Sequence, residues 1–154
     1  MAMLARLQAM MAGLWAGMLL TIGALGAPVL FQMLDKSVAG QIAGRYFFVE
    51  AKVSLVMTAV MLVLERAIVR SESAGQGGPV HSQLSGNLMV LLAILLTVVL
   101  GYEVLQPMMD AARTTAGRWT FMQLHGLSMS LYACRALLIL LLAWRCAGRY
   151  RART

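Results

Sequence analysis

Four long apolar stretches constrain this chain more than any other feature of its sequence. They lie near residues 7–34, 46–66, 84–106 and 119–144. Each is about as long as the roughly 20 residues that cross a hydrocarbon core of about 30 Å. Because a backbone in lipid has to satisfy its own hydrogen bonds, the stretches predict α-helices. We therefore expect an all-α integral membrane four-helix bundle, a single domain over residues 1–154, with helices at about 7–34, 38–69, 84–106 and 119–147.

The distribution of charge supports a membrane protein. Only 12% of the 154 residues are charged, whereas soluble domains hold about 25%. The net charge is +7, but four of the bases are the arginines at 145, 149, 151 and 153, directly after the last apolar stretch. Such a cluster is typical of a cytoplasmic flank, so we expect both termini in the cytoplasm and no nucleic-acid partner.

The segments between the stretches are short. Residues 71–83 are rich in Gly and Ser and predict a cytoplasmic loop in which His81 is solvated. Pro107 is expected to end the third helix. The first stretch is longer than the apolar run of a signal peptide, so we interpret it as a retained span. The sequence shows no internal repeat.

Glycines four residues apart indicate close helix packing. Gly13 and Gly17 lie in the first helix, and Gly40 and Gly44 lie in the second. Small residues at this spacing let helix backbones approach each other in lipid. We expect these glycines, with Gly126, to pack helices within one subunit; a subunit interface is the alternative.

The fourth helix carries its polar residues on one stripe. At 100° per residue, one sector of about 80° holds Phe121, His125, Ser128, Tyr132, Arg135 and Ile139. Because a polar group exposed to lipid costs free energy, the His125 imidazole and the Arg135 guanidinium are expected to face the bundle interior.

Two carboxylates are expected near the histidine. Glu50 shares a face of the second helix with Ser54, and Glu103 lies near the same membrane surface on the third helix. We expect Glu50, Glu103 and His125 to converge in the outer half of the bundle, with Ser128 and Tyr132 beside them. Arg135 is about 15 Å deeper than His125. Helix carbonyls, Tyr132, a glutamate that reaches it, or a neighbouring subunit are its candidate partners.

Three uses of this polar site stay open. His125 is a structural hydrogen-bond partner, a protonatable group, or a ligand of a metal or of haem. A haem usually needs two axial ligands, and the second histidine, His81, is expected on the other membrane face. The two cysteines, 134 and 146, are about 18 Å apart along one helix and cannot form a disulfide. We expect no metal, no cofactor and no catalytic residue.

Several segments resemble the transmembrane protein 205-like family, whose bacterial members are catalogued as a domain of unknown function. They are "GALGAPVLFQML" (23–34), "AGQIAGRYFFVEAKVSL" (39–55), "LQPMMDAAR" (105–113) and "FMQLHGLSMSL" (121–131). The resemblance implies four membrane helices, and it implies that motif positions are occupied by Pro28, Phe31, Gly40, Gly44, Pro107, His125, Gly126 and Ser128. An asparagine is expected near Tyr132 and is missing here, and Arg135 is peculiar to this chain.

Together these observations predict a multi-pass protein of a bacterial cell inner membrane. The expected function is a non-enzymatic transport component or an accessory subunit, and the alternative is a haem b-binding redox protein. The expected partners are the lipid bilayer and either a second copy of the chain or another membrane protein.

Overall fold

The computed structural model describes residues 2–76, 85–114 and 118–151. Four helices in it are long and apolar enough to cross a membrane: Met3–Met33, Lys36–Glu72, Gly86–Thr114 and Phe121–Tyr150. This confirms the predicted all-α four-helix membrane bundle. The chain is a multi-pass membrane protein.

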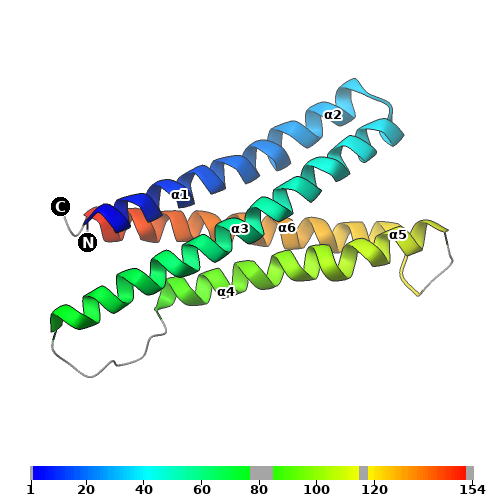
Figure 1. Ribbon diagram of the computed structural model, residues 1–154. Helices are drawn as coiled ribbons and strands as arrows, with labels where there is room; N and C mark the ends of the chain where they lie inside the picture. The colour runs from blue at the N-terminus through cyan, green and yellow to red at the C-terminus, as the bar shows by residue number, and fades with distance from the viewer. Residues whose placement is uncertain (1, 77–84, 115–117, 152–154) are drawn as a thin grey trace.

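The chain forms two helical hairpins. The first runs up through α1 (Ala2–Leu20), the π-helix η1 (Thr21–Gly26) and α2 (Ala27–Met33), and returns through α3 (Lys36–Gln76). The second runs up through α4 (Gly86–Val99), the π-helix η2 (Leu100–Leu105) and α5 (Gln106–Thr114), and returns through α6 (Phe121–Arg151). The start of α1 and the end of α6 lie at one end of the bundle, which we call the terminal end (Figure 1). The opposite end is the far end.

Both prolines of the rising helices follow a π-helical segment. Pro28 and Pro107 are each the second residue of an α-helix, directly after η1 and η2. Proline has no N–H and its ring clashes with the carbonyl four residues earlier, and the wider π-helical turn before each proline accommodates it within a continuous helix. The prediction that Pro107 ends the third helix is therefore wrong, since the helix continues to Thr114.

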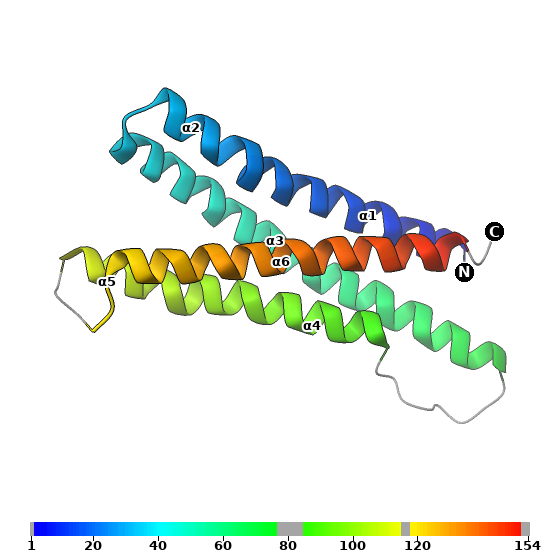
Figure 2. The same cartoon turned by 180° about the vertical axis from the view of Figure 1, so that it is seen from behind.

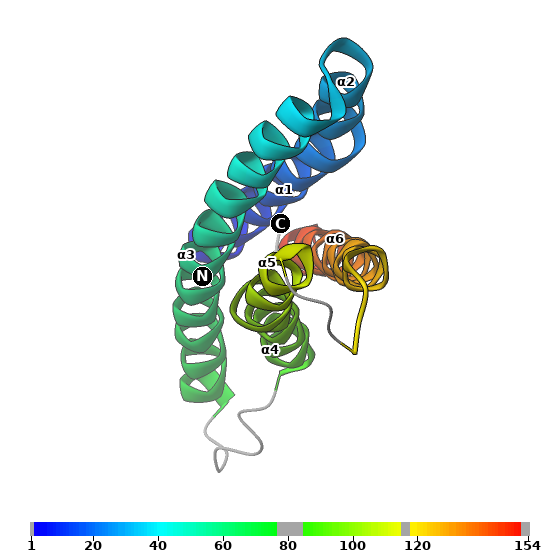
Figure 3. The same cartoon turned by 90° about the vertical axis from the view of Figure 1, so that its right-hand side faces the viewer.

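The four helices pack in a ring. Helix α1 contacts α3 and α6, and α4 contacts the same two helices, so α3 and α6 lie diagonally across the bundle (Figure 3). The main core is apolar and holds Trp15, Leu19, Met61, Ile94, Ile139 and Leu142, all fully buried. A smaller core of Leu105, Met109 and Leu124 joins α5 to α6 near the far end.

The two hairpins are structural repeats. Buried residues of α1 recur on α4 79 positions later, where Gln8, Ala12, Trp15 and Leu19 correspond to Asn87, Leu91, Ile94 and Val98. Those of α3 recur on α6 85 positions later, where Ala39, Glu50, Ser54 and Met61 correspond to Leu124, Arg135, Ile139 and Cys146. The ring of contacts is consistent with a pseudo-twofold axis along the bundle. The expectation of no repeat fails because the repeat lies in the burial pattern rather than in residue identity.

The hairpins diverge at the far end. In Figures 1 and 2, α2 and the first turns of α3 lean away from α5 and the start of α6. The burial pattern agrees, since neither η1 nor α2 contains a buried residue. Apolar side chains such as Leu25, Val29 and Phe31 are 63%, 47% and 49% exposed. The two hairpins are therefore packed against each other toward the terminal end and separated from each other at the far end (Figures 1 and 2).

Candidate functional site

A buried ion pair joins α3 to α6 across the bundle. Nη2 of Arg135 lies 2.5 Å from Oε2 of Glu50, and the two residues are only 5% and 1% exposed. Each lies 14 residues after the start of its helix, at Lys36 and Phe121, so both sit about 21 Å from the far end. This equal register explains why they meet. We call them the central pair.

The first hairpin holds the carboxylate in place. Ser54 lies one turn after Glu50 on α3, and its hydroxyl donates to Oε1 of Glu50 at 2.5 Å. The indole Nε1–H of Trp15 on α1 donates in turn to Oγ of Ser54 at 3.0 Å. A buried indole needs an acceptor for its N–H, and Ser54 supplies it. Three helices thus contribute to one chain of polar contacts.

The second hairpin places an aromatic ring beside the guanidinium. Cζ of Arg135 lies 5.1 Å from the ring centroid of Tyr132, which is within the range of a cation–π contact. The same ring meets Phe47 edge-on, with centroids 5.1 Å apart, and its hydroxyl donates to the Leu19 carbonyl at 2.7 Å. A Cβ at Gly23 would lie 2.6 Å from the ring, so the glycine makes room for Tyr132.

The central pair lies on the pseudo-twofold axis. Glu50 and Arg135 are equivalent positions of the two repeats, and so are Phe47 and Tyr132, because both pairs are 85 residues apart. Equivalent residues can touch each other only where they straddle the axis. The site is therefore built equally by the two hairpins.

The guanidinium of Arg135 uses little of its donor capacity. Its hydrogen bond to Glu50 is made by Nη2 alone, and its buried Nε finds no acceptor among the described residues. A guanidinium carries five N–H donors. An incompletely paired cation therefore lies in the bundle interior, next to a carboxylate that already accepts two hydrogen bonds.

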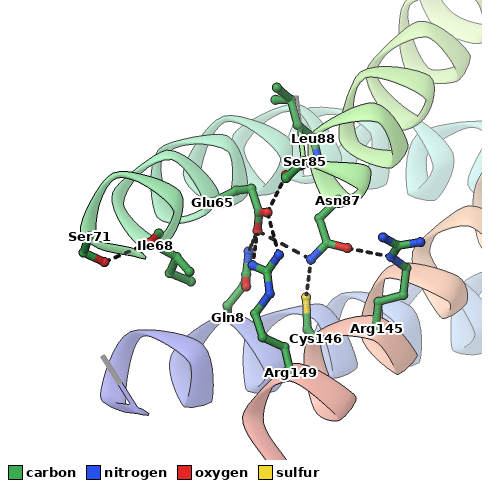
Figure 4. A network of polar contacts seen from close by, with 10 residues as sticks. All are labelled: Gln8, Glu65, Ile68, Ser71, Ser85, Asn87, Leu88, Arg145, Cys146 and Arg149. Atoms are coloured by element: carbon green, nitrogen blue, oxygen red, sulfur yellow. Dashed lines mark hydrogen bonds and ion pairs between the residues drawn. The ribbon is translucent and has the colours of Figure 1, made fainter. Parts of the chain in front are cut away.

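A second polar cluster, the terminal layer, lies about 20 Å away toward the terminal end. Its centre is Glu65, which is 1% exposed and forms a two-pronged ion pair with Arg149 at 2.8 and 3.0 Å (Figure 4). The amide of Gln8 donates to Glu65 at 2.7 Å, and the amide of Asn87, its equivalent in the second repeat, lies 3.5 Å away. All four helices meet at this carboxylate.

The layer also fixes the start of the second hairpin. The hydroxyl of Ser85 donates to Oε1 of Glu65 at 2.6 Å, and its oxygen accepts from the Leu88 N–H at 3.1 Å. Ser85 is thus the N-cap of α4. Arg145 donates to Oδ1 of Asn87 at 2.7 Å, and the buried Cys146 sulfur lies 3.9 Å from the same amide (Figure 4). Every side chain of this layer has at least one partner, and the buried Oε1 of Gln8 is its one atom without a donor among the described residues.

The structure separates the predicted site residues. Arg135 is buried as its stripe predicts, and Tyr132 and Ser128 are half-buried. His125 and Glu103 are exposed, and His125 stacks on Phe121 with centroids 5.7 Å apart. The predicted convergence of both with Glu50 is therefore wrong. Its cause is the length of α3, which begins at Lys36 and so carries Glu50 to the level of Arg135 rather than of His125.

The predicted packing glycines do not pack within the chain. A Cβ would meet nothing within 4 Å at Gly13, Gly17, Gly40, Gly44 or Gly126. The close contacts are made by neighbouring alanines instead, since Ala12 and Ala16 on α1 and Ala39 and Ala43 on α3 are buried. The prediction that these glycines pack helices within one chain is wrong. The alternative, a subunit interface, is compatible with the free space beside them.

The sequence interpretation missed Trp15 and the terminal layer. A tryptophan in the middle of an apolar run was a usable signal, because tryptophans of membrane proteins gather at the interfaces unless a buried acceptor holds them. Gln8, Glu65 and Asn87 stand at the ends of their apolar stretches and there resemble ordinary flanking residues. Only the packing of four helices shows that they meet.

The arrangement suits recognition of a charged group better than metal binding. No group of three or more His, Cys, Asp and Glu side chains that would hold a metal ion occurs in residues 2–76, 85–114 and 118–151. His125 lies outside the interior, and His81 falls outside the described residues. The cysteines are free, Cys134 exposed and Cys146 buried. What the interior offers is a cation with unused donors beside a single carboxylate.

One comparison with known proteins gives a match. A family model described as a domain of unknown function, DUF4149, matches residues 10–118. The matched range contains Glu50 and ends before α6, so Arg135 lies beyond it. No curated protein and no solved structure matches the chain.

Proposed function

The chain belongs to the DUF4149 family, a domain of unknown function, and we propose that it is a non-enzymatic transport component with the central pair as its solute site. One observation carries the proposal. A buried and incompletely paired arginine lies beside a glutamate on the axis between two structural repeats. In transporters built from repeats, the solute site lies at the interface of the repeats near the middle of the membrane.

The burial of the pair favours a functional role. Ionisable groups in membrane helices are expensive and mark solute or proton pathways by default. Replacing a buried ion pair by apolar residues is often neutral or stabilising, so stability alone gives little reason to retain Glu50 and Arg135.

The different packing at the two ends of the bundle favours access of a solute to the central pair from the far end. At the far end the hairpins diverge, and η1 and α2 contribute no buried residue. At the terminal end the Glu65 layer ties all four helices together (Figure 4). Hairpins that are joined at one end and separated at the other favour an approach to the buried central pair from the far end, and alternating access requires such a one-sided approach.

We further propose that the terminal end faces the cytoplasm and that the membrane is the bacterial inner membrane. Support comes from the arginines of this end, including Arg6, Arg70 and Arg145. The relation to the transmembrane protein 205-like family is likewise a proposal, since its most specific segment, residues 121–131, lies beyond the matched range. The proposed partners are the bilayer and a second copy that contacts the open glycines of α1 or α3.

The haem alternative is less well supported. An axial haem ligand has to project into the bundle, whereas His125 lies on its surface against Phe121. We therefore favour the transport component.

Uptake by proteoliposomes tests the proposal. Radiolabelled lactate, choline and alanine represent an anionic, a cationic and a zwitterionic solute. We expect saturable uptake of at least one of them, and a loss of at least 90% in the double variant Glu50→Gln/Arg135→Met, which removes both charges without leaving one unpaired. The matched control is Glu103→Gln, which changes an exposed carboxylate. Equal uptake by the wild type and the double variant for all three solutes would refute the proposal.

A further inference from the structure

The unused donors of Arg135 indicate which solute the central pair accepts. The guanidinium is buried, its Nε has no acceptor among the described residues, and one face lies against the Tyr132 ring. A buried donor without a partner costs about 1–3 kcal/mol. Such a group gains most from a ligand that brings acceptors, and a planar guanidinium matches the two oxygens of a carboxylate.

The carboxylate of Glu50 is held by single contacts. Each of its oxygens accepts one hydrogen bond, Oε1 from Ser54 and Oε2 from Nη2 of Arg135. By contrast, Glu65 receives both terminal nitrogens of Arg149. An incoming carboxylate that engages two nitrogens of Arg135 can therefore replace Glu50 on the guanidinium.

Charge balance then requires a proton. The central pair is neutral when both groups are charged, and an added anion would leave one net negative charge in an apolar interior, which is strongly unfavourable. If Glu50 takes up a proton as the solute arrives, the solute and Arg135 form the neutral pair. The titratable and charged groups that face Glu50 are Arg135 and Tyr132 from α6 and Tyr102 from η2, and α1 contributes the neutral indole of Trp15. Glu50 is the only carboxylate among them.

Aromatic rings beside Arg135 determine which group the solute can carry next to its carboxylate. Tyr132 and Phe47 lie edge to face beside the guanidinium. These rings offer apolar surface and few further donors. A short apolar group next to the carboxylate fits this lining better than a second charge does.

We infer that the central pair binds a short monocarboxylate, which replaces Glu50 on Arg135 while Glu50 takes up a proton, so that solute and proton move together. This inference rests on the proposed transport function and gives it a substrate class. It also predicts that binding is tighter at acidic pH, since protonation of Glu50 frees the guanidinium.

Fluorescence of Trp15 reports on the site directly, because its indole is joined to Glu50 through Ser54. The other two tryptophans, Trp119 and Trp144, are 51% and 82% exposed and are replaced by phenylalanine. The protein in lipid nanodiscs is titrated at pH 6 and pH 8 with propionate, with propionamide as the neutral isostere, and with choline as a cation. We expect a saturable response to propionate, at least tenfold tighter at pH 6, and no response to propionamide.

Two variants separate the roles of the pair. Arg135→Lys keeps the charge but loses the planar fork, so propionate binding should weaken at least tenfold. Glu50→Gln imitates the protonated acid, so binding should persist and lose its dependence on pH. Equal responses to propionate and propionamide, or equal affinity at both pH values in the wild type, would refute the inference.

The failures of the two proposals are distinguishable. If choline gives a response that disappears in Glu50→Gln while propionate gives none, the carboxylate class is wrong and the transport site stands. If no probe alters Trp15 and the proteoliposomes take up none of the labelled solutes, both proposals are wrong. Unchanged thermal unfolding of the Arg135→Lys variant ensures that a lost response reflects the site rather than the fold.

Discussion

Two ion pairs join α3 to α6, and they differ in how completely their groups are hydrogen-bonded. Glu65 accepts from Arg149, Gln8 and Ser85 and lies within reach of the Asn87 amide. Arg135 of the central pair forms one hydrogen bond, to Glu50, and its Nε remains without an acceptor. The spacing of the two pairs along the helices is nearly equal, 15 residues on α3 and 14 on α6.

This difference separates a structural role from a binding role. A buried polar network is most rigid when every member is satisfied. In the terminal layer the neutral Oε1 of Gln8 lacks a donor among the described residues, whereas in the central pair the atom without a partner belongs to a cation. A partly satisfied group is costly to keep and gains from a ligand. We therefore interpret the terminal layer as the clamp that holds the hairpins together, and the central pair as the group that exchanges partners.

The largest expected effect is the loss of the terminal clamp. Glu65→Ala removes the common acceptor of three helices and leaves Arg149 without its partner. We expect the free energy of unfolding to fall by about 4 kcal/mol. The measurement is reversible unfolding in mixed detergent micelles, with Glu103→Ala as the exposed control, for which about 0.5 kcal/mol or less is expected. A change in Glu65→Ala as small as in the control would show that the layer is no clamp.

The central pair should respond differently to single and double substitution. Glu50→Ala leaves the Arg135 charge buried and unpaired and should cost about 3 kcal/mol. Glu50→Leu combined with Arg135→Met removes both charges and should return the unfolding free energy to within about 1 kcal/mol of the wild type. If the double variant is as unstable as the single one, the pair is needed for stability and the contrast between the two pairs disappears.

A smaller effect is expected at the contact between the hairpins beside the central pair. In Gly23→Ala the new Cβ would lie 2.6 Å from Cε1 of Tyr132, so the ring has to move. We expect a loss of about 1–2 kcal/mol, as for other overpacked positions, and weaker solute binding through the displaced ring. Gly17→Ala is the matched control on α1, because its Cβ meets nothing within 4 Å. Equal effects of the two changes would contradict the close approach of Tyr132.

The smallest effect is expected at His125. The imidazole is exposed and contacts Phe121, so His125→Ala should change stability by about 0.5 kcal/mol or less. It should also leave uptake by proteoliposomes unchanged, because the central pair is remote from it. A loss of uptake comparable to that of the Glu50 and Arg135 variants would show that His125 belongs to the solute site.

The sequence predicted the inward direction of Arg135 correctly and that of His125 wrongly. Both residues lie on one helical stripe, but a stripe faces the interior only where neighbouring helices cover it. Near the far end the hairpins diverge, and the stripe around His125 is left uncovered. Two of the candidate partners of Arg135, a glutamate and Tyr132, are the groups that contact it. Glu50 reaches the level of Arg135 because the polar first turns of α3 continue the same helix.

The sequence by itself determined the number and kind of the spans, because a backbone in lipid has no alternative to the helix and composition alone shows where lipid is tolerated. It also determined that polar side chains in the middle of the spans have to form hydrogen bonds or ion pairs with other helices. Only the tertiary structure decided which groups meet. The two repeats share a pattern of buried positions rather than residue identities. The axis that relates them, and the pairing of Glu50 with Arg135 across it, therefore follow only from the packing of the hairpins. Hydrophobicity is a property of each residue, whereas pairing depends on helix register and on the angle at which two hairpins cross.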